Sequence, residues 1–148
     1  MCRINQKFLT FLLGQAWAHQ SDFTTRNNYY GVQYPTKVKV VSNANPSEMQ
    51  VWDNLDLDSE GIEGWYVPNI LNEYGQTSRI LQNIFKKEEN VFRAAFKRDT
   101  SNGQANSIVN GKVLRSKTLE LELQNDSTEE TPLLEIKIFS TLSEITNK

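Results

Sequence analysis

The chain has 148 residues, which is enough for one domain with its own core and too few for two domains of ordinary size. Its 16 Lys and Arg residues and 18 Asp and Glu residues give a net charge of -2, and the basic residues are spread along the sequence. This argues against binding to nucleic acid or an anionic membrane through a strongly basic surface. The single cysteine, Cys2, excludes an internal disulfide framework and a thiolate-rich metal site.

Residues 8–22 read FLTFLLGQAWAHQSD and have three interpretations: an export signal, an amphipathic helix, or a hairpin of two strands. Two basic residues, Arg3 and Lys7, precede the segment, and Ala16-Trp17-Ala18 resembles a small-residue cleavage site, as in an export signal. However, the apolar run before Gly14 has six residues, whereas such signals usually have roughly 7–15. A membrane span is excluded, because it would need about 20 apolar residues.

A hairpin fits this segment better than a helix does. Gly14 would interrupt a helix in its middle at a cost of roughly 1 kcal/mol, and no capping residue stands just before Phe8. In a hairpin, residues 8–11 are strand formers, Leu13-Gly14 supplies the turn, and residues 15–19 alternate polar with apolar. We therefore predict a hairpin, and we expect the strand from Phe8 to Phe11 to be an open edge.

The next segment predicts a bend and two strands. Asn27-Asn28 and Gly31 mark a bend around Tyr29-Tyr30. Pro35 opens a strand in which Val38 and Val40 alternate with Lys37 and Lys39, as in a half-buried strand. Asn45-Pro46 predicts a turn or a single helical turn. Residues 49–57 predict a strand with an irregularity near Asp53-Asn54, where the apolar alternation breaks.

The middle of the chain predicts short elements. Residues 65–71 read WYVPNIL and predict a strand at a sheet edge, because Pro68 cannot donate a backbone hydrogen bond. Residues 73–79 predict a loop, and residues 80–90 predict a short helix with an apolar face. Residues 91–96 return to strand alternation. The polar residues 100–111 predict a hairpin tip or mobile loop.

The C-terminal part gives the strongest strand signal. Leu119, Leu121 and Leu123 alternate with polar residues, and so do Leu134, Ile136 and Ile138. An acidic linker, NDSTEETP, joins these two segments, which predicts an antiparallel pair with one face on the core. The fold expected from all of these signals is mainly β, an antiparallel sheet or sandwich with one short helix. It is expected as one domain, with an N-terminal hairpin at 1–22 and a main body at 23–148.

Candidate catalytic and metal-binding residues are few. His19, the only histidine, has no nucleophile and orienting carboxylate in an obvious arrangement, and it is better explained as a hydrogen-bonding residue at a strand end. The acidic residues Asp53, Asp56, Asp58 and Glu60 do not follow the calcium-loop pattern, so they are better explained as a solvated strand face. We expect no enzyme activity, no metal and no cofactor.

Aromatic residues concentrate in the first half of the chain. An exposed subset could stack on sugar rings or anchor a protein interface, whereas the simpler explanation for each of them is the core. The residues are Trp17, Tyr29, Tyr30, Tyr34, Trp52, Trp65 and Tyr66.

One series of short motifs resembles a known family. The chain contains Trp17 and His19, then RNNYYG at residues 26–31, then Asn45-Pro46 and a strand from Trp52 to Leu55. In this order the motifs resemble the C-terminal region of large virion proteins of tailed bacteriophages, including the muzzle or stabilisation proteins of crAss-like phages. The resemblance extends over residues 8–142 and assigns structural roles to Trp17, His19, Arg26, Asn27, Tyr30, Gly31 and Pro46.

The resemblance implies a structural protein of the phage tail that acts through contacts between subunits. The expected partners are other tail proteins and further copies of the chain, with no nucleic acid and no membrane, and the expected location is the virion. Phe8, Phe11, Trp52, Trp65 and Tyr66 are the candidate interface residues. Since family members are usually many hundreds of residues long, the chain is expected to be a terminal part of a larger protein, a split reading frame or a compact relative. The alternative function is a secreted β-sandwich module that binds carbohydrate.

Overall fold

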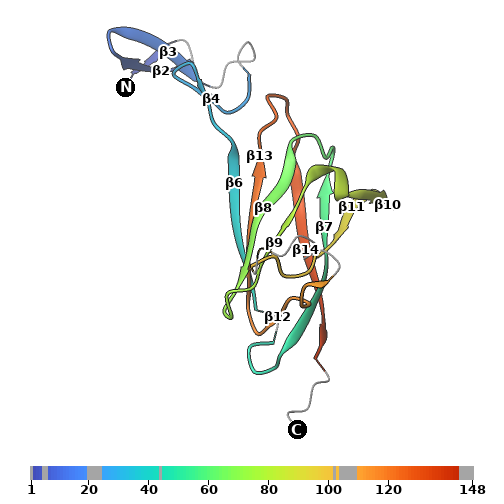
Figure 1. The fold of residues 1–148 in the computed structure, drawn as a ribbon. Helices are drawn as coiled ribbons and strands as arrows, with labels where there is room; N and C mark the ends of the chain where they lie inside the picture. Colours follow the sequence, from blue (N-terminus) through green and yellow to red (C-terminus); the bar gives the residue numbers. More distant parts are fainter. Residues whose placement is uncertain are drawn as a thin grey trace.

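The computed structural model in Figure 1 describes residues 2–4, 7–19, 25–43, 45–101, 103 and 110–143. Two antiparallel sheets form a sandwich, and a small hairpin sheet lies beyond one end of it. The expectation of a mainly β, antiparallel fold is confirmed. Much of the predicted loop at residues 100–111 lies outside the described residues.

The first sheet has the strand order β6-β13-β8-β9. Its strands are β6 (Thr36–Ser42), β13 (Leu119–Asn125), β8 (Trp65–Asn72) and β9 (Thr77–Ile80). The leucines of β13 are fully buried, as their alternation predicted. On the outer face, Lys39 of β6 forms an ion pair with Glu120 of β13, with 2.6 Å between the charged atoms.

The second sheet is built around β7 (Gln50–Ser59). One side of β7 pairs along its whole length with β14 (Leu133–Leu142), and the other side pairs with β11 (Val91–Ala95) and β12 (Arg115–Ser116). Outside β11 lies β10 (Lys86–Glu88).

The core lies between these two sheets. Its indole groups are hydrogen-bonded, since Trp52 Nε1 donates to Ser116 Oγ at 2.7 Å and Trp65 Nε1 donates to the Thr131 carbonyl at 3.2 Å. Buried indole N–H groups would otherwise cost stability. The buried hydrophobic residues are Trp52, Leu55, Leu57, Trp65, Val67, Ile70, Ile80, Phe85, Phe92, Ala94, Leu114, Leu119, Leu121 and Leu123.

The predicted pairing of the two C-terminal strands is wrong. β13 pairs with β6 and β8, while β14 pairs with β7 in the opposite sheet. Ile136 and Ile138 pack against the core as expected, but Leu134 is 67% exposed. The reason is a bulge: Leu133 pairs with Ser59 and Glu135 with Asp58, so Leu134 is an extra residue that shifts the alternation.

The predicted helix at residues 80–90 is also wrong. Only Gln82–Ile84 form a single 3-10 turn, and residues 86–88 are strand β10. Glu89 and Asn90 both have positive φ angles, 46° and 73°, and make the tight turn between β10 and β11. Two-residue turns of this kind suit the twist of a hairpin, so the charged end of the predicted helix is a hairpin instead.

Two predictions for residues 65–79 are also wrong. β8 lies between β13 and β9, so it is not an edge strand. Pro68 is tolerated because the pairing of β8 shifts register between Val67 and Ile70 with β9, and opposite Glu122 to Gln124 with β13. The predicted loop at 73–79 is shorter, because Thr77 already begins β9.

The irregularity predicted near Asp53-Asn54 is confirmed. Phe139 of β14 pairs with Asn54 and Ser140 with Trp52, which leaves Asp53 as an extra residue in β7. This bulge turns Trp52 to the core while Leu55 and Leu57 remain buried. The half-buried alternation predicted for residues 37–40 and the strand predicted from residue 91 are confirmed as β6 and β11.

The predicted N-terminal hairpin is confirmed. β2 (Lys7–Leu12) and β3 (Gln15–His19) pair around the Leu13-Gly14 turn. The expectation that Phe8 to Phe11 form an open edge is wrong over part of its length, because β1 (Cys2–Ile4) pairs with β2 up to Leu9. A second small hairpin follows, β4 (Asn28–Tyr29) and β5 (Val32–Gln33), with Tyr30-Gly31 as its turn.

Candidate functional site

The tip of the β2–β3 hairpin has an unusual turn sequence. Both turn residues, Leu13 and Gly14, have positive φ angles, 49° and 77°. Such turns favour Asn-Gly or Asp-Gly, whereas a residue with a Cβ atom costs roughly 1–2 kcal/mol in left-handed backbone conformation. The Leu13 side chain is 95% exposed, so it offsets none of this cost by packing. Folding therefore does not explain Leu13, which points to a function at the tip.

One face of the hairpin is attached to the β4–β5 turn through Tyr30. Thr10 Oγ1 lies 2.6 Å from Nε2 of His19 and donates a hydrogen bond to the Tyr30 hydroxyl at 3.0 Å. The rings of Trp17 and His19 both meet the Tyr30 ring edge to face, with centroids 5.7 Å and 5.6 Å apart. Edge-to-face pairs are favourable contacts of aromatic rings. This cluster of Thr10, Trp17, His19 and Tyr30 fixes the hairpin to the rest of the protein.

Gly31 is required where it stands. Its φ angle is 80°, and a Cβ atom added to it would lie 3.3 Å from Cη2 of Trp17. The left-handed backbone favours glycine, and the close approach of Trp17 leaves little room for a side chain. The bend predicted at RNNYYG is therefore confirmed as a tight turn that packs on the hairpin.

The opposite face of the hairpin is apolar and, among the described residues, largely exposed. Because Leu9 pairs with Ala18 and Phe11 with Ala16, these four residues share the face that points away from Tyr30. Phe11 is 62% exposed, and both alanines are exposed. An exposed apolar face on a projecting element is typical of an interaction site.

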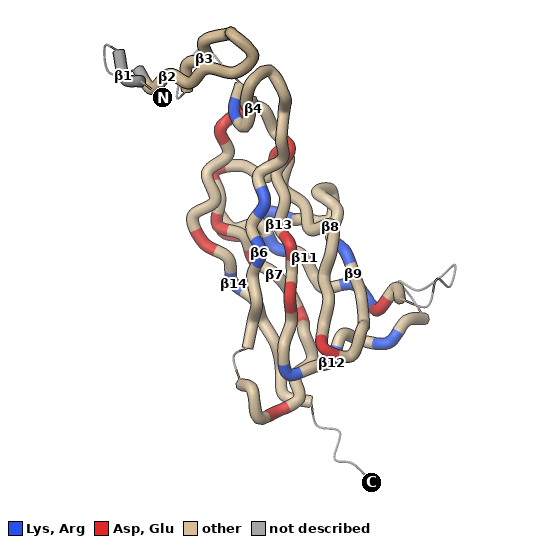
Figure 2. Tube along the Cα trace, turned by 90° about the vertical axis from the view of Figure 1, so that its left-hand side faces the viewer, with Lys and Arg blue, Asp and Glu red and all other residues tan. Residues whose placement is uncertain are grey.

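A groove lies on the sandwich between β6 and β14, the two strands that Figure 2 shows along one side of the molecule. Its volume is about 610 Å³. Each strand pairs on one side only, so among the described residues β6 and β14 both have an edge without a strand partner. The groove is lined by the apolar residues Val38, Trp65, Pro132, Leu133, Leu134 and Ile136 and by Arg26, Glu129, Glu130 and Glu135, among others.

The loop before β14 shapes this groove. The backbone N–H of Arg26 donates to the Thr128 carbonyl at 3.0 Å, and the Arg26 guanidinium forms an ion pair with Glu130. Asn125, at the end of β13, donates to Thr131 Oγ1 at 2.6 Å and accepts from the Ser127 N–H at 2.7 Å. These bonds hold the corner where the chain passes from one sheet to the other.

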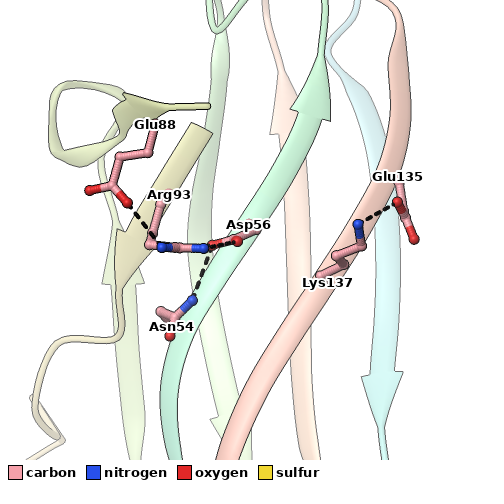
Figure 3. Close-up of polar contacts among 6 residues, drawn as sticks. All are labelled: Asn54, Asp56, Glu88, Arg93, Glu135 and Lys137. Carbon is pink, nitrogen blue, oxygen red and sulfur yellow. Dashed lines mark hydrogen bonds and ion pairs between the residues drawn. The ribbon is translucent and has the colours of Figure 1, made fainter. Parts of the chain in front are cut away.

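A charged network lies on the outer face of the second sheet (Figure 3). Arg93 of β11 binds Asp56 of β7 through two hydrogen bonds, of 2.8 Å and 2.6 Å, and binds Glu88 at 2.9 Å. Lys137 of β14 stands opposite Asp56 in the strand register and pairs with Glu135 at 2.8 Å. The hydrogen bonds from Arg93 hold the pKa of the Asp56 carboxyl below its usual value. Arg93 therefore ties β11 to β7 and to β10, whereas the Lys137–Glu135 pair lies within β14. These pairs are best explained as contacts that stabilise the sheet.

The structure separates the predicted interface residues into two groups. Phe8 and Phe11 are exposed on the hairpin, and Tyr66 is half-buried on β8, where its hydroxyl donates to Gln124. Trp52 and Trp65 are only 3% and 4% exposed. The expectation that these two tryptophans form an accessible aromatic surface is therefore wrong, because they fill the core.

The other motif residues have local structural roles. Asn27 adopts a positive φ angle of 59°, and its carbonyl accepts from the Tyr34 N–H at 3.0 Å. Pro46 lies in a turn closed by a bond from the Glu48 N–H to the Asn45 carbonyl at 3.2 Å. The turn predicted there is confirmed.

Sequence reasoning missed three parts of the site: Thr10, the exposed turn residue Leu13, and the groove. A Leu directly before the Gly of a predicted tight turn was the available signal for Leu13. Nothing in the sequence could indicate the groove, since it is formed by two strands that are distant in the chain.

No group of three or more His, Cys, Asp and Glu side chains could hold a metal ion within the described part of the chain. Asp56 is bound by Arg93, and His19 by Thr10. Within the same part of the chain, no helix has the length and apolar character needed to cross a membrane.

A comparison with models of known protein families gives one match. A model of the Crassvirus muzzle protein C-terminal domain matches residues 24–99, just over half of the chain. The chain belongs to this family. The matched region of the muzzle domain runs from before β4 to beyond β11 and includes Arg26, Asn27, Tyr30, Gly31 and Pro46. The resemblance seen in the sequence is therefore confirmed, and the muzzle domain is a phage structural domain. Trp17, His19, β13 and β14 lie outside the matched residues, and a search of curated proteins gave no match.

Proposed function

We propose that the chain is a structural component of a phage tail and acts by binding neighbouring subunits. The observation that carries this proposal is the membership in the Crassvirus muzzle family. Other tail proteins and further copies of the chain are the proposed partners, and the proposed location is the tail of the virion. The proposed mode of action is packing, not catalysis.

The N-terminal hairpin is the proposed contact element. It projects beyond the sandwich (Figure 1), carries exposed Phe8, Phe11 and Leu13, and has an apolar face on which Phe11, Ala16 and Ala18 are exposed. Large exposed aromatic and aliphatic side chains are the residues that usually anchor protein interfaces. The carbohydrate-binding alternative loses its main support, because Trp52 and Trp65 are buried.

The proposal is tested by mass spectrometry of purified particles from an infected culture, with tails separated from capsids. We expect peptides of this chain in the tail fraction at a constant ratio to other tail proteins. Peptides that occur in infected cells but are lost from purified particles would contradict the proposal.

A truncation tests the role of the hairpin. Without residues 1–13, the two sheets of the sandwich keep all of their strands, so the β signal in circular dichroism should persist. Incorporation into particles should be lost. Complete unfolding would show that the hairpin belongs to the core, and normal incorporation would show that the contact lies elsewhere.

A further inference from the structure

We propose that a polar pocket at the end of the sandwich opposite the N-terminal hairpin binds the carboxylate of an acidic side chain on a partner protein. β12, which begins with Arg115, marks this end in Figure 1. The pocket has a volume of about 560 Å³, within the range of roughly 300–1,000 Å³ that is usual for binding pockets. Its lining includes two cationic side chains, Lys112 and Arg115, and one anionic side chain, Asp99. Such a site goes beyond the proposed function, because it depends only on the geometry of the pocket.

Arg115 is a cationic donor without an acceptor. Its backbone is held in place, because its N–H donates to Gln76 Oε1 at 2.9 Å and its carbonyl accepts from Asn72 Nδ2 at 3.2 Å. Its guanidinium, by contrast, forms no ion pair with the described residues, and its Nε atom is buried without a hydrogen-bond partner. A buried donor left unpaired lowers stability, most of all in a charged group. An acceptor brought by another molecule would therefore be bound favourably at Arg115.

The acidic residue in the wall of the pocket does not serve as this acceptor. Asp99 is buried and accepts hydrogen bonds from the Thr77 N–H at 3.0 Å and from the Ser101 N–H and hydroxyl, both at 2.9 Å. Residues 100–113, which join Asp99 to the strand of Arg115, contain no Asp or Glu. The described part of the chain thus brings no free carboxylate to Arg115.

The charge of the pocket fits a single carboxylate. Lys112 and Arg115 carry two positive charges and Asp99 carries one negative charge, which leaves an excess of one positive charge. Among the described residues, Lys112 forms no ion pair either. The planar guanidinium of arginine matches the two oxygens of a carboxylate. Nucleic acid fits less well, because its binding depends on several phosphate contacts and the chain has a net charge of -2.

Apolar groups at the pocket favour a protein side chain over a free anion. Tyr74 and Val113 also line the pocket, and both are exposed. They can pack against the methylene groups and the backbone that accompany a glutamate carboxylate in a peptide, and they offer nothing to a small inorganic ion. Sites of this kind usually combine an apolar lining with a few polar groups that fix orientation.

A titration followed by NMR tests the site in the full chain labelled with ¹⁵N. The probe is the capped peptide acetyl-Gly-Glu-Gly-amide, and the control peptide carries Gln in place of Glu, so that only the charge differs. We expect saturable shifts of the Arg115 Nε–H signal and of the Ser101 and Val113 amide signals with the Glu peptide and none with the Gln peptide. Sodium acetate should bind several-fold more weakly than the Glu peptide, because it lacks the contacts with Tyr74 and Val113.

Arg115→Gln removes the guanidinium and keeps a polar side chain. Affinity for the Glu peptide should fall about tenfold or more, as expected for the loss of a charge-assisted hydrogen bond. The matched control is Arg79→Gln, because Arg79 is exposed on the nearby strand β9 and does not line the pocket. This variant should bind like the unmodified chain. Lys112→Gln should weaken binding by a smaller factor, and it decides the question if Arg115→Gln does not fold.

The remaining outcomes overturn the proposal. Shifts that sodium chloride reproduces at the same concentration show screening of charge only. Acetate or inorganic phosphate that binds as tightly as the Glu peptide assigns the pocket to a small anion, and tighter binding of a DNA oligonucleotide assigns it to nucleic acid. Equal weakening by Arg79→Gln shows nonspecific attraction. Shifts that do not saturate in the millimolar range show that the pocket holds no carboxylate.

Discussion

Gly31→Val should detach the hairpin from the β4–β5 turn. Valine at a φ angle of 80° costs about 1–2 kcal/mol from backbone strain alone. Its Cβ atom would also lie 3.3 Å from Trp17, and the two methyl groups would push the indole away from Tyr30. Loss of that edge-to-face pair adds about 0.5–1.5 kcal/mol. The expected total is about 1.5–3.5 kcal/mol, the sum of these two effects.

Gly75→Val is the matched control, because Gly75 has a φ angle of 75° and an added Cβ atom would meet nothing within 4 Å. It carries the backbone strain without the Trp17 contact. Near-UV circular dichroism and amide hydrogen exchange of β2 and β3 are the measurements. Gly31→Val should lower protection of the hairpin, and Gly75→Val should not. Equal protection in both variants would refute the role of the Trp17 contact. Gly31→Asn should give intermediate protection of the hairpin, because asparagine adopts this backbone conformation more readily than valine does.

Leu121→Ala should lower the free energy of unfolding by about 2–5 kcal/mol in urea denaturation, because Leu121 is fully buried between the sheets. Leu134→Ala should change the free energy of unfolding by less than about 0.5 kcal/mol, because Leu134 is exposed. A near-zero effect at Leu121 would refute the core assignment. Since the pKa of Asp56 is lowered in the folded chain, its ion pair stabilises the fold above the unfolded pKa, and this stability is lost as the pH falls through the folded pKa. Asp56→Asn should therefore lower the free energy of unfolding by about 1–2 kcal/mol at neutral pH, a value between those typical of an exposed and of a buried ion pair. It should also flatten the acid side of the profile of stability against pH. An unchanged profile would contradict this.

The sequence predicted strands well because alternation depends on burial of one face. The leucines of β13 and the Lys-Val alternation of β6 each face one side of a sheet, so their period of two was visible. The break near Asp53 was visible for the same reason. The Leu134 bulge was not, since Leu133 and Leu134 are both apolar and either could face the core.

Partner strands could not be predicted from alternation. β13 and β14 look like a hairpin in sequence, yet the hydrogen bonds of Asn125 to Thr131 and Ser127 turn the chain into the opposite sheet. Similarly, the spacing of Ile80, Ile84 and Phe85 suits a helix, but the Glu89-Asn90 turn makes a hairpin of the following residues. Local turn geometry decided both cases.

The proposed function requires the hairpin tip for assembly into the virion. The most direct measurement is the ratio of Leu13→Asn chain to unmodified chain when both are produced together in infected cells, determined by mass spectrometry in the lysate and in purified particles. We expect a marked depletion of the Leu13→Asn chain in the particles relative to the lysate. Equal ratios in lysate and particles would contradict it.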